Sequence, residues 1–120
     1  MGNRIKKDSI FIVAETLIDN SAQKAGEVIG YHKDDNNRWI TEDINGNKFQ
    51  NLISNLRNGN YYKILKQYSI SDIVDYLRSR NKNYYTVCYE FIVNAIHTAF
   101  RETRISSIDD IYGYVHTYLL

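Results

Sequence analysis

The first half of the chain alternates apolar and polar positions in the manner of β-strands. Residues 10–18, IFIVAETLI, open with a nearly continuous run of β-branched and other apolar residues, which is typical of a strand buried on both faces. Residues 25–32 and 39–44 alternate along their length, and the polar, turn-forming sequence KDDNNR separates them. We therefore predict a central strand followed by a β-hairpin.

The sequence DINGNKF, residues 43–49, has two interpretations. Oxygen-bearing side chains occupy positions one, three and five of a helix-loop-helix calcium site, at Asp43, Asn45 and Asn47. Lys48, however, replaces the glycine of position six, and Ser54 replaces the bidentate glutamate of position twelve. Asn45-Gly46 is in contrast a preferred pair for a two-residue hairpin turn with positive φ, so we predict a turn.

Helical spacing begins after this turn. Within residues 49–57 the apolar positions predict a helix that ends at Asn58-Gly59 and buries Phe49, Leu52, Ile53 and Leu56. Residues 61–66 alternate again, which predicts a short strand.

Three more helices follow from the spacing of the second half. Ser69 and Asp72 form a capping box for the first, whose buried stripe is Ile70, Ile73, Val74 and Leu77. The second spans residues 84–101, and its apolar face consists of Tyr84, Cys88, Phe91, Ile92, Ala95, Ile96, Ala99 and Phe100. The last begins at Ser106 or Ser107, has Asp109 or Asp110 in its first turn, and buries Ile108, Ile111, Tyr112, Val115 and Leu119.

These elements predict an α+β fold in a single domain, residues 1–120. A small antiparallel sheet of about four strands with one inserted helix occupies residues 1–66, and a three-helix half, residues 67–120, packs against it. A chain of 120 residues is long enough for one core and too short for two well-packed domains.

Composition and charge narrow the function classes. The formal net charge is +1, from 15 basic and 14 acidic side chains, which excludes a DNA mimic and a strongly basic nucleic-acid coat. Proline is absent, 11 residues are tyrosine, and isoleucine, asparagine and lysine are frequent. The codons of these four abundant residues are rich in A and T, which favours an AT-rich genome or a mobile element.

The single cysteine, Cys88, excludes an internal disulfide and a thiolate zinc cluster, and it favours a reducing cytoplasm. The apolar run of residues 10–14 is too short for a signal peptide, because Glu15 interrupts it. No segment approaches the ~20 apolar residues of a membrane span. We therefore expect a cytoplasmic protein without a membrane partner.

Catalytic groups are not found in a recognisable pattern. His32, His97 and His116 fall on a predicted strand and two different helices, and His97 is predicted on a solvated helix face. Cys88 is predicted on an apolar face, where a thiol acts as a small hydrophobe. The chain has neither a G-x-S-x-G elbow nor a glycine-rich phosphate loop. The sequence thus predicts a non-enzymatic protein with no catalytic residue, metal or cofactor.

Residues 57–85 hold the candidate chemistry for binding. Six cations against two aspartates give a local excess of four, and six tyrosines are interleaved with them. Arginine and lysine contact phosphates, while tyrosine stacks on bases or anchors protein interfaces. The predicted partner-binding residues are Arg57, Tyr61, Tyr62, Lys63, Lys66, Arg78, Arg80, Lys82, Tyr84 and Tyr85. A third interpretation is a set of half-buried tyrosines with solvated cations.

We therefore expect a small inhibitor or regulator of a macromolecular partner, of the kind that phages and other mobile elements encode. A host protein is the favoured partner. The alternative is a nucleic-acid or nucleotide-binding regulator that uses residues 57–85. The last helix ends in the apolar sequence YLL, residues 118–120, which predicts a homodimer through that helix.

Overall fold

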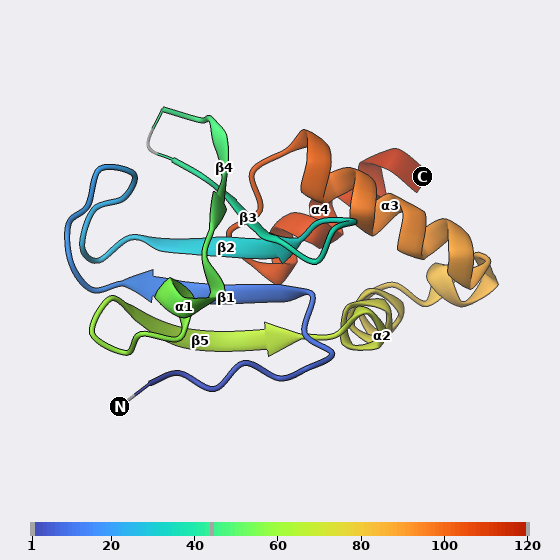
Figure 1. Cartoon of the computed structure of the whole chain (residues 1–120). Helices are drawn as coiled ribbons and strands as arrows, with labels where there is room; N and C mark the ends of the chain where they lie inside the picture. The colour runs from blue at the N-terminus through green and yellow to red at the C-terminus, as the bar shows by residue number, and fades with distance from the viewer. Residues whose placement is uncertain (1, 44, 120) are drawn as a thin grey trace.

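The computed structural model describes residues 2–43 and 45–119, which form a five-stranded sheet followed by helices (Figure 1). The strands are β1 (Phe11–Thr16), β2 (Val28–Lys33), β3 (Trp39–Glu42), β4 (Lys48–Asn51) and β5 (Tyr62–Tyr68). The helices are α1 (Ile53–Leu56), α2 (Ile70–Arg80), the 3-10 helix η1 (Lys82–Thr86), α3 (Tyr89–Glu102) and α4 (Ile108–Leu119). The predicted α+β class is confirmed, with five strands in place of about four.

β1 is an interior strand, as predicted. The strand order is β4-β3-β2-β1-β5, so β1 pairs with β2 on one side and with β5 on the other, and all neighbouring pairs are antiparallel. Every residue of β1 except Glu15 is buried, as its apolar run predicts for a strand covered on both faces. β2 and β3 form the predicted hairpin.

The sheet curls so that its two edge strands approach each other. β4 crosses one face of β1 and β2, and α1 leads from it toward the start of β5 (Figure 1). The side-chain amide of Asn51 in β4 donates a hydrogen bond to the Tyr62 hydroxyl in β5 at 3.1 Å. We call the apolar cluster inside this curl the curl core: Ile12, Ala14, Ile29, Tyr31, Trp39, Leu56 and Tyr62.

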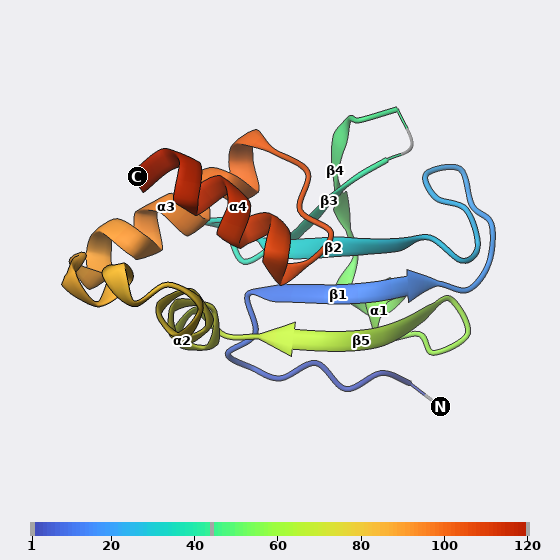
Figure 2. The same ribbon diagram turned by 180° about the vertical axis from the view of Figure 1, so that it is seen from behind.

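The helices α2, α3 and α4 gather at one end of the sheet, and α4 lies on the face opposite to β4 (Figure 2). Successive side chains of a strand point to opposite faces. Ile12 and Ala14 of β1 therefore enter the curl core, whereas Phe11 and Val13 enter a second, helical core. This helical core also contains Ile73, Val74, Leu77, Tyr84, Ile92, Ala95, Ile96, Ala99, Phe100, Ile105, Ile111 and Val115.

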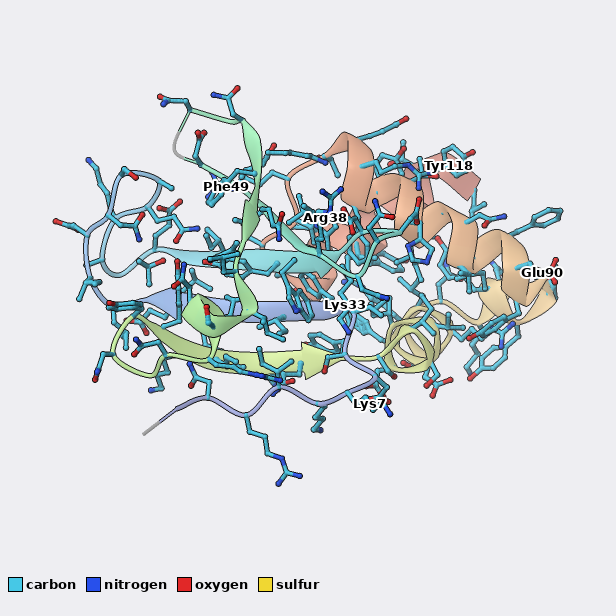
Figure 3. The ribbon with its side chains drawn as sticks, viewed as in Figure 1. Lys7, Lys33, Arg38, Phe49, Glu90 and Tyr118 are labelled. Carbon is cyan, nitrogen blue, oxygen red and sulfur yellow. The ribbon has the colours of Figure 1, made fainter. Side chains whose placement is uncertain are left out.

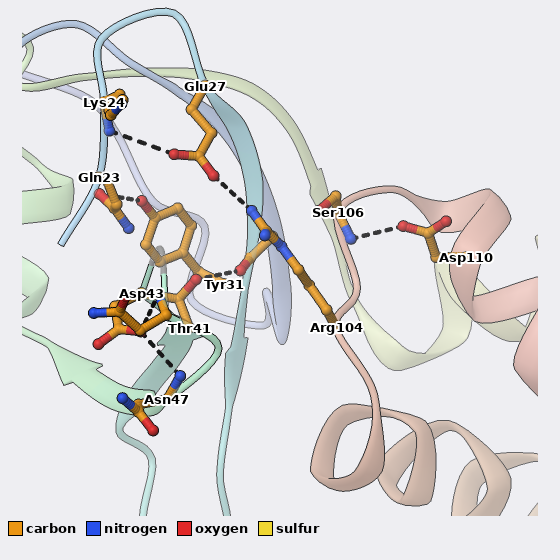
Figure 4. A network of polar contacts seen from close by, with 12 residues as sticks. Gln23, Lys24, Glu27, Tyr31, Thr41, Asp43, Asn47, Arg104, Ser106 and Asp110 are labelled. Carbon is orange, nitrogen blue, oxygen red and sulfur yellow. Dashed lines mark hydrogen bonds and ion pairs between the residues drawn. The ribbon is translucent and has the colours of Figure 1, made fainter.

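Gly30 of β2 lets the loop between α3 and α4 touch the sheet. A Cβ atom at Gly30 would lie 2.0 Å from the Ile105 carbonyl oxygen and 2.6 Å from the Phe11 ring. In the same loop, Arg104 forms an ion pair with Glu27 at 2.6 Å (Figure 4). The helical half is thus fixed on the sheet at a position where no larger side chain fits.

The helix predicted over residues 49–57 is wrong. Lys48–Asn51 form β4, which pairs with β3 in the register Thr41↔Phe49, and only Ile53–Leu56 make one helical turn. A hairpin turn requires a strand on each side, so the residues that follow the turn complete the ladder with β3, and only the four residues after it are left for the helix.

The turn at residues 43–47 is confirmed, and it is longer than the predicted two residues. The Asp43 N–H donates to the Asn47 carbonyl at 2.9 Å, and the Gly46 N–H donates to the Asp43 carbonyl at 3.1 Å. Gly46 has a φ of +83°, as the predicted turn requires of its glycine. The Asp43 carboxylate accepts from the N–H groups of Asn45 and Asn47, each at 2.9 Å, so it stabilises the turn (Figure 4).

The helix predicted over residues 84–101 begins later, at Tyr89. Residues Lys82–Thr86 form η1, so Cys88 stands at the N-cap of α3 and is exposed, and its predicted burial is wrong. The first turn of α3 lies beyond the end of the sheet (Figure 1), which leaves Phe91 63% exposed, also contrary to the prediction.

Candidate partner-binding site

The structure separates the ten residues that the sequence predicts as a binding surface. Tyr62 is 6% exposed and Tyr84 is fully buried, so neither presents a surface to a partner. The Tyr84 hydroxyl instead shares a hydrogen bond with Nδ1 of His116 at 3.2 Å. The other eight fall on two parts of the molecule, with Arg57, Tyr61, Lys63 and Lys66 on α1–β5 and with Arg78, Arg80, Lys82 and Tyr85 on α2–η1.

Arg78 and Arg80 are engaged within the protein. Arg80 forms an ion pair with Asp109 of α4 at 2.7 Å, and its guanidinium lies 3.9 Å from the ring centre of Tyr112. Arg78 lies 5.7 Å from the ring centre of Tyr85. These contacts join α2 to α4 and to η1, and they leave the two arginines less free to bind phosphate.

Three of the predicted cations, Arg57, Lys63 and Lys66, join three others from the N-terminal segment along the outer edge of β5. Residues 3–9 run beside β5 (Figures 1 and 2), where the Gln67 side chain accepts from the Lys6 N–H at 2.9 Å and donates to the Arg4 carbonyl at 2.7 Å. Together with residues 57–67, this segment forms what we call the basic edge; Figure 3 labels Lys7 on it. Its exposed cations are Arg4, Lys6, Lys7, Arg57, Lys63 and Lys66. Asp8 is the one carboxylate in the two segments, so the basic edge has a net charge of +5.

A hollow of about 460 Å³ lies between β4, the loop from β1 to β2, and the start of β5. We call it the β4 hollow. Its apolar and aromatic lining is Ile18, Ala22, Phe49, Leu52, Tyr61 and Tyr62, and its polar lining is Asn20, Ser21, Gln50, Asn51 and Asn55. None of these side chains carries a formal charge. Figure 3 shows Phe49 on the side of β4 that faces the loop.

The loop wall of the β4 hollow is held by its own polar side chains. The Asn20 side-chain carbonyl accepts from the N–H groups of Ala22 and Gln23 at 2.9 and 2.8 Å, and the Asp19 carboxylate accepts from the Ala25 N–H at 2.8 Å. Such side-chain-to-backbone bonds define a turn without a ladder. They hold the loop next to Ile18, which is 44% exposed at the rim.

A cluster of buried polar groups lies under the β4 hollow. The Gln23 side-chain carbonyl accepts from the hydroxyls of Tyr62 at 2.9 Å and of Tyr31 at 3.3 Å, and Figure 4 shows the bond to Tyr31. Burial raises the pKa of Tyr31, so its hydroxyl stays neutral. Nε2 of Gln23 and Oγ1 of Thr16 are buried without a hydrogen-bond partner among the described residues. Asn51 and Tyr62 connect this cluster to the hollow, because both line it.

The lining of the β4 hollow determines what it can bind. Amide and hydroxyl groups donate and accept hydrogen bonds, and the apolar rim covers nonpolar parts of a ligand, so the site suits a neutral, hydrogen-bonding molecule. Its lining contains no carboxylate, imidazole or thiol, and its proton-exchanging groups are the hydroxyls of Ser21, Tyr61 and Tyr62.

A smaller hollow of about 50 Å³ lies between β2 and α3. The His32 ring stacks on Phe100 with ring centres 4.8 Å apart, and His97 meets the same ring edge-on at 6.2 Å, so His97 contributes to packing rather than only to a solvated face. Burial, together with the charge of Lys48, whose Nζ donates to the Phe100 carbonyl at 2.5 Å, lowers the pKa of His32 to about 4. The His32 imidazole is therefore neutral in this contact. The hollow of about 50 Å³ that remains is small for a ligand.

Within residues 2–43 and 45–119, no group of three or more His, Cys, Asp or Glu side chains is placed to hold a metal ion. None of the described helices combines the length and the apolar character that crossing a bilayer requires. The absence of a cofactor stays a prediction.

A second apolar surface surrounds the start of α3, where Tyr85, Tyr89 and Phe91 are exposed. Arg78 lies 5.7 and 6.0 Å from the ring centres of Tyr85 and Tyr89, so two of these rings already contact a cation of the same chain. The three rings are as exposed as the rim residues of the β4 hollow, and the contact with Arg78 is what distinguishes Tyr85 and Tyr89 from them.

Only part of the apolar sequence at the C-terminal end of α4 is exposed to solvent. Tyr118 is 60% exposed and stacks on Tyr114 with ring centres 6.0 Å apart. Leu119 packs against the helical core, and Leu120 lies outside the described residues. The homodimer through this helix stays a prediction.

Sequence reasoning missed the β4 hollow because it placed Phe49 and Leu52 on the buried face of a helix. The one available signal was the turn at Asn45-Gly46, since a hairpin turn implies that the residues after it form a strand. Ile18 and Gln23 carried no signal, because the loop that holds them meets β4 only through the curl of the sheet.

Comparison of the chain with protein-family models, with curated proteins and with solved structures found no match. The functional interpretation therefore depends on the geometry and chemistry of the β4 hollow and the basic edge.

Proposed function

We propose that the chain is a non-enzymatic binding protein that inhibits or regulates a protein partner through the β4 hollow. The observation that carries this proposal is the apolar rim around an uncharged lining, in which Leu52 is 57% and Tyr61 40% exposed. The small size, the AT-rich residue usage and the single cysteine support a regulator encoded by a phage or other mobile element and acting in the cytoplasm.

Protein interfaces have the same chemical character as this hollow. Their centres are depleted of charged residues and enriched in aromatic ones, and a few buried anchors provide most of the binding energy. Covering exposed apolar surface gains about 25 cal/mol per Å². Leu52, Ile18 and Tyr61 would supply that gain at the rim, and the amides below would satisfy polar groups of the partner.

The basic edge favours a second candidate, a nucleic-acid or nucleotide-binding regulator. Its net charge of +5 lies on two adjacent segments, and Tyr61 stands at one end of β5, where it can stack on a base. This surface keeps four of the ten predicted binding residues, Arg57, Tyr61, Lys63 and Lys66, and adds Arg4, Lys6 and Lys7, which the sequence does not place beside them.

Affinity capture from a host lysate, with and without nuclease, distinguishes the two candidates. The matched baits are the wild type, Leu52→Ser at the hollow, and Lys63→Ala with Lys66→Ala at the basic edge. Serine is a favoured N-cap, and Leu52 is the N-cap of α1, so this change leaves the helical turn intact. We expect one protein that survives nuclease, is retained at least tenfold less by Leu52→Ser, and is unaffected by the lysine changes.

Two results would contradict the protein-partner proposal. Retention that disappears with nuclease and falls steeply as salt rises would support the nucleic-acid candidate, because phosphate contacts release counterions. A protein retained equally by the wild type and by Leu52→Ser would show that the β4 hollow is not the binding site.

A further inference from the structure

The chain covers one edge of its sheet and leaves the other open. Along β5, the Asn3 side-chain amide donates to the Tyr62 carbonyl at 2.8 Å, and Gln67 binds the backbone of residues 4–6. No described segment pairs with the outer side of β4. An open edge presents unpaired N–H and C=O groups, which is a template for another strand.

The register shows which backbone groups of β4 are free. Asp43 bonds to Asn47 at the turn, and the bonded pairs of an antiparallel ladder then recur at every second residue, at Thr41↔Phe49 and Trp39↔Asn51. The N–H and C=O groups of Lys48 and Gln50 therefore point away from β3. Gln50 also lines the β4 hollow, so the free edge and the hollow are adjacent.

The chemistry of the hollow selects among possible strands. A strand beside β4 would place alternate side chains over Phe49, Leu52 and Ile18, which are apolar. The lining carries no charge to pair with a charged side chain, and burial of an unpaired charge is costly. β4 has four residues, so its ladder spans about 13 Å and matches a segment of about four residues.

We propose that the partner protein contributes an extended, uncharged peptide segment, which adds to β4 as a sixth strand. The peptide backbone bonds to Lys48 and Gln50, and its apolar side chains enter the β4 hollow. This inference rests on the proposed function and specifies which part of the partner is recognised.

Selection from a phage-displayed library of random twelve-residue peptides, followed by binding of one synthetic peptide to the full chain, tests the inference. We expect enrichment of peptides with a central uncharged stretch in which apolar residues alternate. Addition of the peptide should shift the backbone amide resonances of Lys48 and Gln50 more than those of Phe49 and Asn51. Enriched acidic peptides, shifts confined to the basic edge, or no enrichment would overturn it.

Two variants of one residue isolate the main-chain contact. Gln50→Pro removes the free N–H, and proline is tolerated at an edge strand where that N–H faces outward. Gln50→Ala removes the same side chain and keeps the N–H. We expect the peptide to bind Gln50→Pro at least tenfold more weakly than Gln50→Ala, and equal affinities would overturn the added strand.

Other outcomes separate this inference from the proposed function. If a partner protein is retained through Leu52 but Gln50→Pro retains it as well as Gln50→Ala does, the function stands and the strand addition is wrong. If sedimentation shows a dimer of this chain that Gln50→Pro dissociates, a second copy occupies the edge, which also overturns the inference.

Discussion

The helical core and the curl core lie on opposite faces of the same strands and contain different kinds of side chain. The helical core is almost wholly apolar, and the hydroxyl of its Tyr84 is hydrogen-bonded to His116. Next to the curl core lie Thr16, Gln23 and Asn51, all buried. Three buried side-chain atoms have no partner among the described residues, and all belong to this side: Thr16 Oγ1, Gln23 Nε2 and Trp39 Nε1.

This difference separates stability from binding. Close-packed apolar side chains stabilise the helical core, whereas unpartnered buried polar groups cost free energy and are retained in proteins mostly where function requires them. The curl core is also the side with the larger hollow and the open edge. We therefore expect changes in the helical core to alter stability alone, and changes at the β4 hollow to alter binding.

The largest expected effect is a loss of stability in the helical core. Ile96→Ala removes a fully buried side chain and leaves a cavity, which should lower the free energy of unfolding by about 2–5 kcal/mol. Urea unfolding followed by fluorescence of Trp39 measures this loss. Partner binding by the folded fraction should be unchanged. A loss of affinity in that fraction would show that the helical core contributes to binding as well as to stability.

The packing of α3 on β2, where the His32 ring stacks on Phe100, should weaken in acid. The pKa of His32 is about 4 in the folded chain, against 6.5 for an ordinary histidine. Between these two pH values His32 is protonated in the unfolded chain and neutral in the folded chain, so proton binding favours unfolding. The free energy of unfolding should therefore fall by about 2 kcal/mol between pH 7 and pH 5.

Urea unfolding of the wild type and of His32→Gln across this pH range checks the effect. Lys48 and His97 face His32 and oppose its protonation, while Asp34 favours it. The variant should lose most of the pH dependence, even if its stability at pH 7 is lower. An unchanged pH dependence in His32→Gln would show that another group causes it.

A smaller effect is expected from the polar cluster under the β4 hollow. Tyr62→Phe deletes the hydroxyl that accepts from Asn51 and donates to Gln23, which should destabilise the fold by about 1–2 kcal/mol. Tyr31→Phe is the matched control, because its hydroxyl donates to the same Gln23 oxygen through a longer bond, at 3.3 Å. Thermal unfolding compares them, and equal losses would contradict the role assigned to the Asn51–Tyr62 bond.

The smallest effect is expected from the ion pair between the sheet and the α3–α4 loop. Glu27 and Arg104 are both partly exposed, and pairs of this kind contribute less than about 1 kcal/mol. Glu27→Gln should therefore change the urea midpoint only slightly, and the difference should vanish in high salt. A loss as large as that of Ile96→Ala would show that this pair, rather than packing at Gly30, joins the two halves.

Local chemistry made much of the fold predictable. The capping box at Ser69 is present, with the Asp72 N–H donating to the Ser69 hydroxyl at 3.1 Å and the Asp72 carboxylate accepting from the Ser69 N–H at 2.9 Å. The start of α4 has the same arrangement, because the Asp110 N–H donates to the Ser107 hydroxyl at 3.3 Å and the Asp110 carboxylate accepts from the Ser107 N–H at 3.2 Å. The same carboxylate also accepts from the Ser106 N–H, as Figure 4 shows. Caps depend on residues three or four apart, which a sequence shows directly.

The β4 hollow was not predictable because it depends on distant residues. The spacing of Phe49, Leu52 and Leu56 suits a helix face as well as a strand followed by one helical turn, and only pairing with β3 decides between them. In the same way, the sequence shows the cations of residues 4–7 and 57–66 as two separate groups, and Gln67 brings them together.

The most direct test of binding at the β4 hollow compares two exposed apolar side chains, one at the hollow and one at the start of α3. Leu52 at the β4 hollow is 57% exposed, and Phe91 at the start of α3 is 63% exposed, so a change to serine costs little stability at either position. Capture of the partner protein from nuclease-treated lysate by Leu52→Ser and Phe91→Ser baits measures which surface binds. We predict that Leu52→Ser loses the partner and Phe91→Ser retains it, and the opposite result would contradict a partner surface at the β4 hollow.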